Sequence, residues 1–113
     1  MVDMEEVMKV LEAQKNKYTD ERVAKHFKTW SKKLQYHFSD IDEYYVIELI
    51  KGEPQDIVKE KLEDPDIMYS MSTDTFLSLN KGEISGFKAW QRKLLKIKAT
   101  PAETMKLQKL DKI

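Results

Sequence analysis

The stretch Ile67-Met68-Tyr69-Ser70-Met71-Ser72-Thr73-Asp74-Thr75-Phe76-Leu77-Ser78-Leu79 decides the fold, because its apolar period changes partway along. Ile67, Tyr69 and Met71 alternate with Met68, Ser70 and Ser72, which is typical of a strand. Ser72 and Thr73 can then cap a short helix that Gly82 ends. The stretch therefore predicts a strand that leads directly into a helix.

Upstream of this stretch, the sequence predicts two helices and three strands. Asp3 caps the first helix and Thr19 begins the second, whose inward stripe is Val23, Phe27 and Trp30. Strands are expected at 34–38 with Gln35 and His37 on its polar face, at 44–50 as an inner strand, and at 55–62 as a charged edge strand.

Downstream, two more helices flank a last strand. Ser85 caps a short helix whose expected inward residues are Phe87, Trp90 and Leu94, and residues 95–99 form a fifth strand. Thr100-Pro101-Ala102-Glu103 combines a cap, a proline at the first helical position and a Glu three residues after the cap. The last helix carries Met105, Leu107, Leu110 and Ile113.

The order of these elements predicts an α+β fold in one domain over residues 1–113. We expect N-terminal helices at 1–31, a strand meander at 32–72, and the remaining helices, the last strand and the C-terminal helix at 73–113. No apolar run approaches the roughly 18 residues of a membrane span. The chain contains no cysteine, which excludes disulfides and thiol chemistry and favours a cytoplasmic location.

The net charge is zero, but it is unevenly placed. Residues 81–113 hold nine Lys and Arg against three acids, so this part carries +6 and residues 1–80 carry −6. A basic end favours transient contact with an anionic membrane surface, although a simple solvated face explains it as well. Nucleic-acid binding is not expected, because Phe87 and Trp90 are the only aromatic residues in this part and both fit a core.

The sequence offers no catalytic constellation, no metal site and no cofactor motif, so we do not expect an enzyme. His26 and His37 have no second ligand at metal-binding spacing and are expected to face solvent. Ser85 precedes Gly86 but is better explained as a helix cap. The acids at 40–43 lack the glycine and the length of a calcium loop, so a hydrated hairpin is expected.

The C-terminal half resembles a known family. The quoted stretch is followed by Lys81-Gly82, by Ala89-Trp90-Gln91-Arg92-Lys93-Leu94-Leu95-Lys96-Ile97-Lys98-Ala99 and by Met105-Lys106-Leu107-Gln108-Lys109-Leu110. In order and spacing these segments resemble the sterol carrier protein type-two domains, also called sterol-carrier-like or non-specific lipid-transfer domains. The resemblance covers residues 66–110.

This resemblance implies a five-stranded mixed sheet covered by helices, with an apolar tunnel between sheet and helices for a fatty acid, an acyl chain or a sterol-like lipid. The last helix would act as a lid, with Arg92, Lys93 and Lys106 at the mouth. The implied ligand-binding residues are Met71, Phe76, Leu79, Phe87, Trp90, Leu95, Ile97, Met105 and Leu110.

Three departures from the family pattern qualify this expectation. Lys93 and Ala99 stand where the family has glycine, so a different helix-to-strand junction is expected. The chain ends in Asp111-Lys112-Ile113 instead of a peroxisomal tripeptide, which favours a cytoplasmic protein from a prokaryote. Trp90 replaces the usual Phe, so a structural or protein-interaction domain with a filled tunnel stays open, as does a homodimer.

Overall fold

The computed structural model describes residues 2–112, and the side chains of residues 2–110. Its helices are α1 (Met4–Asn16), η1 (Lys17–Thr19), α2 (Glu21–Phe27), α3 (Thr73–Asn80), α4 (Gly86–Gln91), α5 (Pro101–Leu107) and η2 (Gln108–Lys112), where η marks a 3₁₀ helix. Its strands are β1 (Lys32–Phe38), β2 (Glu43–Ile50), β3 (Glu53–Pro54), β4 (Val58–Lys59), β5 (Ile67–Met71) and β6 (Lys96–Lys98). Ile113, expected in the last helix, lies outside the described residues.

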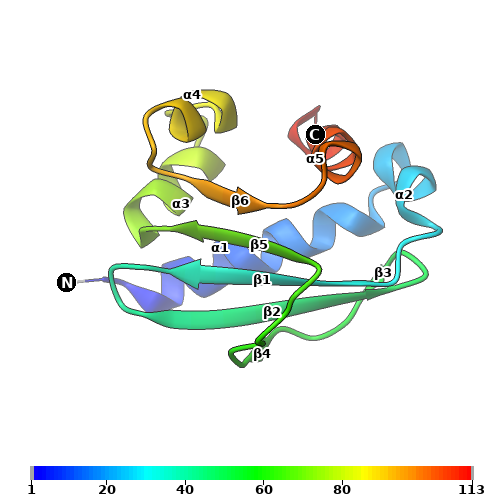
Figure 1. Cartoon of the computed structure of the whole chain (residues 1–113), viewed down its shortest axis with the longest axis horizontal. Helices are drawn as coiled ribbons and strands as arrows, with labels where there is room; N and C mark the ends of the chain where they lie inside the picture. Colours follow the sequence, from blue (N-terminus) through cyan, green and yellow to red (C-terminus); the bar gives the residue numbers. More distant parts are fainter. Residues whose placement is uncertain (1, 113) are drawn as a thin grey trace.

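The strands form one mixed sheet in the order β3-β2-β1-β5-β6, with β4 also paired to β2 (Figure 1). β1 is antiparallel to β2 and parallel to β5, and β6 is antiparallel to β5. A row of cross-strand partners, Tyr45, Tyr36, Tyr69 and Ile97, crosses four strands. The predicted α+β fold with a mixed sheet covered by helices is confirmed. Over the described residues 2–112, the sheet has six strands and not the predicted five, and the predicted meander over residues 32–72 is wrong after β2, because β5 crosses back to pair in parallel with β1.

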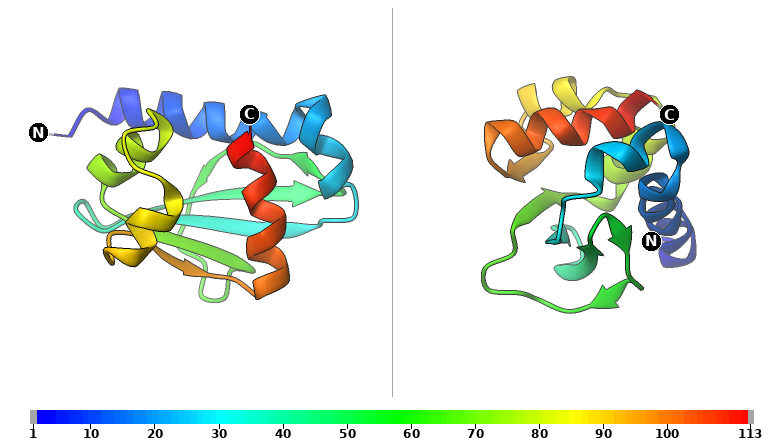
Figure 2. Two further views of the ribbon diagram at one scale, coloured as in Figure 1. Left: turned by 90° about the horizontal axis from the view of Figure 1, so that it is seen from above. Right: turned by 90° about the vertical axis from the view of Figure 1, so that its right-hand side faces the viewer.

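The helices lie on one side of the sheet, and the connection from β4 to β5 runs over the other (Figures 1 and 2). Seen from above, α1 runs along one edge, α3 and α4 cover one end, and α5 crosses the other end beside α2 (Figure 2). The helices that cross the sheet therefore form two groups, α3 with α4 and α5 with α2, and α1 runs past both of them (Figure 2).

Most predicted helix caps are confirmed. The side chains of Asp3, Ser72 and Ser85 accept hydrogen bonds from backbone N–H groups in the first turns of α1, α3 and α4. Thr100 and Glu103 form the full capping box of α5.

The predicted start of the second helix at Thr19 is wrong by one residue. Asp20 is the cap, since its carboxylate accepts from the Arg22 N–H at 2.9 Å. The Thr19 hydroxyl instead donates to the Asn16 carbonyl at 2.7 Å and belongs to η1.

The prediction of one strand at 55–62 is wrong. The edge position is right, but within this segment only Val58 and Lys59 of β4 pair with β2, and the other short pairing, that of β3, comes before it. The chain then leaves the edge and crosses the face of the sheet opposite the helices, which we call the second face. There the Leu62 N–H donates to Gln35 Oε1 at 2.6 Å. This crossing covers Gln35, which is buried and not on an exposed polar face as predicted.

The prediction that Phe87 and Trp90 point inward is also wrong. The two side chains are 67% and 58% exposed, and Leu94 is exposed as well. The buried positions of this region are Ala89 and Leu95. Because Ala89 is small and is the buried residue of α4, the helix packs closely on the core while its two aromatic residues face outward.

The junction after α4 keeps the backbone that glycine favours, although the residue is a lysine. Lys93 has a φ of +62°, in the left-handed region, and its N–H donates to the Trp90 carbonyl at 3.0 Å. Ala99 does not adopt a positive φ. The expectation of a different junction is therefore wrong at Lys93.

Candidate ligand-binding site

The core between sheet and helices divides into two clusters of buried apolar residues. The first cluster lies under α1, α3 and α4, and the second lies under α2 and α5. The first consists of Val7, Leu11, Tyr36, Phe38, Tyr45, Ile47, Met71, Phe76, Ala89 and Leu95. The second consists of Tyr18, Val23, Phe27, Trp30, Leu34, Leu49, Ile67, Leu107 and Leu110.

Tyr69 of β5 lies where the two clusters meet. It is only partly buried and packs against both of them. Its ring stacks on Tyr36 with centroids 4.9 Å apart, and its cross-strand partner on the other side is Ile97 of β6, which is also partly buried. We call the line through Tyr36, Tyr69 and Ile97 the seam.

The structure distributes the nine sequence-predicted ligand residues unevenly. Met71, Phe76 and Leu95 lie in the first cluster, with Leu79 and Ile97 packed against it. Leu110 lies in the second cluster. Phe87, Trp90 and Met105 face outward, Met105 being 69% exposed. Six of the nine thus border the interior on either side of the seam, and three do not.

The sequence did not predict that a polar group, the Tyr18 hydroxyl, is buried inside this apolar core. Tyr18, in the second cluster, is fully buried and its hydroxyl has no hydrogen-bond partner, alone among the buried polar side-chain atoms of residues 2–110. Burial raises the pKa of Tyr18 well above its usual value, and the neighbouring Tyr36 and Tyr69 raise it further. Tyr36 is also buried, but its hydroxyl bonds to Gln14. No local pattern in the sequence singles out Tyr18, because its burial depends on packing among η1, α2 and α5.

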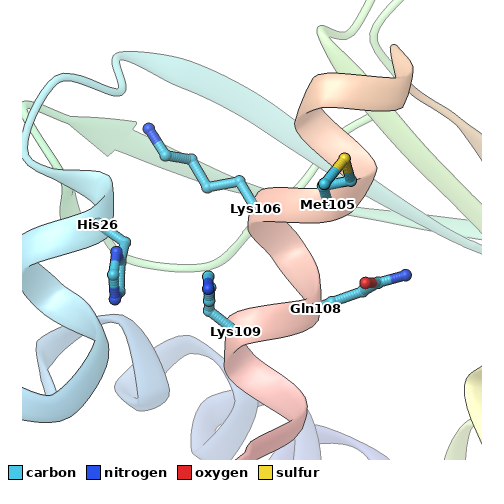
Figure 3. A pocket seen from close by; sticks show the side chains of 5 residues that line it. All are labelled: His26, Met105, Lys106, Gln108 and Lys109. Atoms are coloured by element: carbon cyan, nitrogen blue, oxygen red, sulfur yellow. The ribbon is translucent and has the colours of Figure 1, made fainter.

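Few contacts hold α5 and η2 over the second cluster. Leu107 and Leu110 are their buried residues. Lys32 forms an ion pair with Glu103 at 2.6 Å, and the Lys106 ammonium lies 5.3 Å from the centre of the Trp30 ring. Beside this segment, a pocket of about 290 Å³ is lined by His26 of α2 and by Met105, Lys106, Gln108 and Lys109 (Figure 3).

The face of the sheet opposite the helices holds an arrangement that resembles catalytic machinery. His37 Nδ1 lies 3.0 Å from Ser70 Oγ, and Nε2 lies 3.0 Å from Asp42 Oδ1. His37 is half-buried, not solvent-facing as predicted, and stacks on Tyr44. Asp42 is 81% exposed, so water screens its charge. In a catalytic triad, the histidine Nδ1 faces the acid and Nε2 faces the serine. Here Ser70 lies at Nδ1 and Asp42 at Nε2, so the two partners are exchanged.

The acids of the β1–β2 turn have separate partners. Asp40 accepts from the Thr73 N–H at 3.0 Å and from its hydroxyl at 2.6 Å, which ties the turn to the start of α3. Asp42 contacts His37, while Glu43 accepts from the Tyr45 hydroxyl and pairs with Lys59. No group of three or more His, Asp or Glu residues suited to a metal ion occurs within the described part of the chain.

None of the helices between residues 2 and 112 combines the length and the apolar content that crossing a bilayer needs. His26, the second predicted solvent-facing histidine, is half-buried at the edge of the pocket.

A comparison with protein families matches residues 8–112 to the SCP-2 sterol transfer family. The chain belongs to this family. A search of curated proteins found no match. The match spans all six strands and most of α1, which agrees with the resemblance seen in the sequence and extends it toward the N-terminus.

Solved structures of SCP-2 domains share the fold. The second sterol carrier protein domain of Helicoverpa armigera is 18% identical, with a TM-score of 0.73 over 94% of this chain and 85% of that one. The sterol carrier protein 2-like 2 of Aedes aegypti is 10% identical, with a TM-score of 0.64 over 92% and 97%. A ubiquinone synthesis protein, UbiJ-SCP2, is 9% identical, with a TM-score of 0.63 over 92% and 94%.

The fold also occurs inside a larger enzyme. The sec-alkylsulfatase Pisa1 from Pseudomonas sp. is 13% identical, with a TM-score of 0.56 over 67% of this chain. This chain spans only 12% of that enzyme's length. The same fold therefore accounts for most of the solved insect chains and for a small part of this longer enzyme.

Proposed function

We propose that this SCP-2 domain binds an apolar ligand, such as a fatty acid, an acyl chain or a sterol-like lipid, between the sheet and the helices, without catalysing a reaction and without a cofactor. Its cargo would occupy the seam, between the helix group α3–α4 and the segment α5–η2. The lack of cysteine agrees with a reducing compartment, and we place the domain in the cytoplasm on that ground.

The division of the core at Tyr69 is the observation that carries this proposal. A small domain buries its apolar residues best in one continuous cluster. Here Tyr69 remains partly exposed where it packs against both clusters, and Ile97 and Leu79 remain partly exposed beside the first cluster, so apolar surface is available along the seam. A ligand that covered about 300 Å² of apolar surface there would gain about 7 kcal/mol at 25 cal/mol per Å².

The proposed wall has three parts. Ile97 lies in the seam itself, Leu110 lies in the second cluster, and the side of the first cluster supplies Met71, Phe76, Leu79 and Leu95. Met71 supplies a flexible thioether that adapts to different ligands. The proposed lid is α5 with η2, because among the side chains described for residues 101–110 only Leu107 and Leu110 are buried in the core. Phe87, Trp90 and Met105 face outward in this structure and are not assigned to the wall.

The unpaired Tyr18 hydroxyl supports a ligand with one polar atom at its end. A buried hydroxyl without a partner costs about 1–3 kcal/mol, and a carboxyl, hydroxyl or carbonyl group on the ligand would supply the missing partner. A purely hydrocarbon ligand would leave this cost in place.

The test is to purify the protein, extract it with organic solvent and identify bound lipids by mass spectrometry, with a parallel titration using a fluorescent fatty-acid probe. We expect lipid in the extract and saturable probe binding that the extracted lipid reverses. If repeated extracts are empty and no probe binds, the proposal is wrong.

A structural or protein-interaction domain of the same fold is the alternative. The Tyr36–Tyr69 stack supports this alternative, because these two side chains would fill part of the seam themselves. This alternative predicts no probe binding and a stable complex with a protein or with a second copy of the chain, measured by analytical ultracentrifugation.

A further inference from the structure

Four large apolar side chains are exposed on the side of the molecule that carries the helices. Phe87, Trp90 and Leu94 belong to α4 and the turn that follows it, and Met105 belongs to α5. Both helices lie above the sheet on this side (Figures 1 and 2). We call Phe87, Trp90 and Leu94 the apolar patch, and Met105 is a further exposed apolar residue on the same side of the molecule. A single exposed apolar residue needs no explanation, but a group that includes two aromatic rings with centroids 6.1 Å apart marks an interaction surface.

The backbone holds the α4 part of this patch in place. Ala89 is fully buried, and its carbonyl accepts from the N–H groups of Leu94 at 2.8 Å and Leu95 at 3.2 Å. Leu95 is buried in the first cluster. The outward direction of Phe87 and Trp90 thus follows from a packed helix and an anchored turn.

Cations surround the patch and have few partners. Lys88, Arg92, Lys93 and Lys96 are exposed, and none forms an ion pair with any side chain described within residues 2–110. Lys106 of α5 and Lys109 of η2 follow Met105 in the sequence and line the same pocket as Met105 (Figure 3). This concentration accounts for much of the +6 charge of residues 81–113.

The combination of exposed apolar residues with these cations limits which kind of partner could cover the patch. A second copy of the chain in a two-fold dimer would bring the same cations face to face, which is repulsive. Nucleic acid would use the cations but would leave Leu94 and Met105 without apolar partners. An anionic bilayer offers phosphates at the level of the cations and hydrocarbon just below them. Trp and Phe are also suited to the membrane interface.

We propose that this domain docks on anionic lipid bilayers through the apolar patch, with Phe87 and Trp90 inserted among the head groups and with Lys88, Arg92, Lys93 and Lys96 paired to lipid phosphates. This inference goes beyond ligand binding, because docking needs neither a bound ligand nor the seam. If both proposals hold, docking places the side of the molecule that carries α4 and α5 against the source of the ligand.

The experiment is sedimentation of the full chain with vesicles of phosphatidylcholine alone or with phosphatidylglycerol added. We expect binding that rises with the anionic fraction and weakens as salt is added. The double variant Phe87→Ser, Trp90→Ser should bind at least tenfold more weakly. The matched control is Ile50→Ser, Val58→Ser, because these residues are 46% and 50% exposed but lie on β2 and β4, away from the patch. It should bind like the wild type.

The charge variant Lys88→Glu, Arg92→Glu gives a second reading, because each basic residue lost near an anionic surface weakens binding about fivefold. All the substituted positions are exposed, so circular dichroism should show unchanged folding. Equal binding to neutral vesicles, or equal loss in the control variant, would overturn the proposal. So would a concentration-dependent dimer that the Phe87→Ser, Trp90→Ser variant abolishes. If the wild-type protein binds vesicles but does not bind the fluorescent fatty-acid probe, the proposed ligand binding is wrong and the proposed docking is still supported.

Discussion

Tyr69 stacks on Tyr36 across parallel strands, with ring centroids 4.9 Å apart and an angle of 18° between the ring planes. Tyr36 is buried in the first cluster, whereas Tyr69 is partly exposed and touches both clusters. The stack therefore joins the two halves of the core at the place where the helix layer is divided. This relationship underlies the proposed binding site.

Replacing Tyr18 by Phe should leave the stability unchanged or raise it by about 1 kcal/mol, because the variant removes a buried hydroxyl that has no partner. Tyr36→Phe is the matched control. Its hydroxyl bonds to Gln14, so its loss should lower the stability by about 0.5–1.5 kcal/mol. Urea unfolding measures both values. A Tyr18→Phe variant less stable than Tyr36→Phe would show that the Tyr18 hydroxyl is paired.

Gly52→Ala should destabilise the fold by more than about 2 kcal/mol. Gly52 has a φ of +83°, and an added Cβ would lie 2.6 Å from the Phe27 carbonyl oxygen. Gly86→Ala is the control, because a Cβ at Gly86 meets no atom within 4 Å and α4 begins there. It should be neutral or stabilising in thermal unfolding. Equal losses for both variants would contradict the tight turn.

Lys93→Gly should stabilise the protein by about 1 kcal/mol, because a lysine in the left-handed region carries a steric cost that glycine avoids. Lys88→Gly, inside α4, removes the same side chain at a helical position and should destabilise by a similar amount. Chemical denaturation distinguishes the two signs. A destabilised Lys93→Gly variant would mean that the Lys93 side chain has an important contact.

These results show which parts of the fold the sequence predicts well. Thr100, Pro101 and Glu103 form a cap from three neighbouring residues, so the start of α5 was predictable from local chemistry alone. The path of residues 55–62 was not predictable from local chemistry. It depends on Gln35, which is distant in the sequence and accepts a hydrogen bond from the Leu62 N–H.

In the candidate site, too, some side-chain positions were predictable from the local sequence, and others depend on residues far away in the chain. Leu95 and Ile97 alternate as a strand should, and both border the first cluster. The outward direction of Phe87 and Trp90 was not predictable from their apolar character, because it depends on Ala89 packing against the core. The partnerless Tyr18 hydroxyl likewise results from contacts among elements far apart in the chain.

Acid should destabilise the link between the β1–β2 turn and α3. Burial alone would raise the pKa of Asp40, but hydrogen bonds from the Thr73 side chain and backbone, and from the backbone of Asp40 and Ile41, hold it below its usual value. A lowered pKa in the folded state means that this stabilisation is present above the ordinary carboxyl range of about 4 and is lost as the pH falls below it.

The Asp40→Asn variant should therefore be less stable than the wild type near neutral pH, and the difference should shrink near pH 3. Urea midpoints at several pH values measure this. A constant difference across the range would show that ionisation of Asp40 does not contribute.

Binding of a fluorescent fatty-acid probe to Ile97→Glu tests the central claim most directly, because a carboxylate at this position would stand in the seam beside Tyr69. Val58→Glu is the control, since it adds the same charge at an exposed apolar residue on β4. We predict that Ile97→Glu weakens probe binding at least tenfold while Val58→Glu binds like the wild type, with both variants folded by circular dichroism. Equal affinities for the wild type, Ile97→Glu and Val58→Glu would contradict a ligand site at the seam.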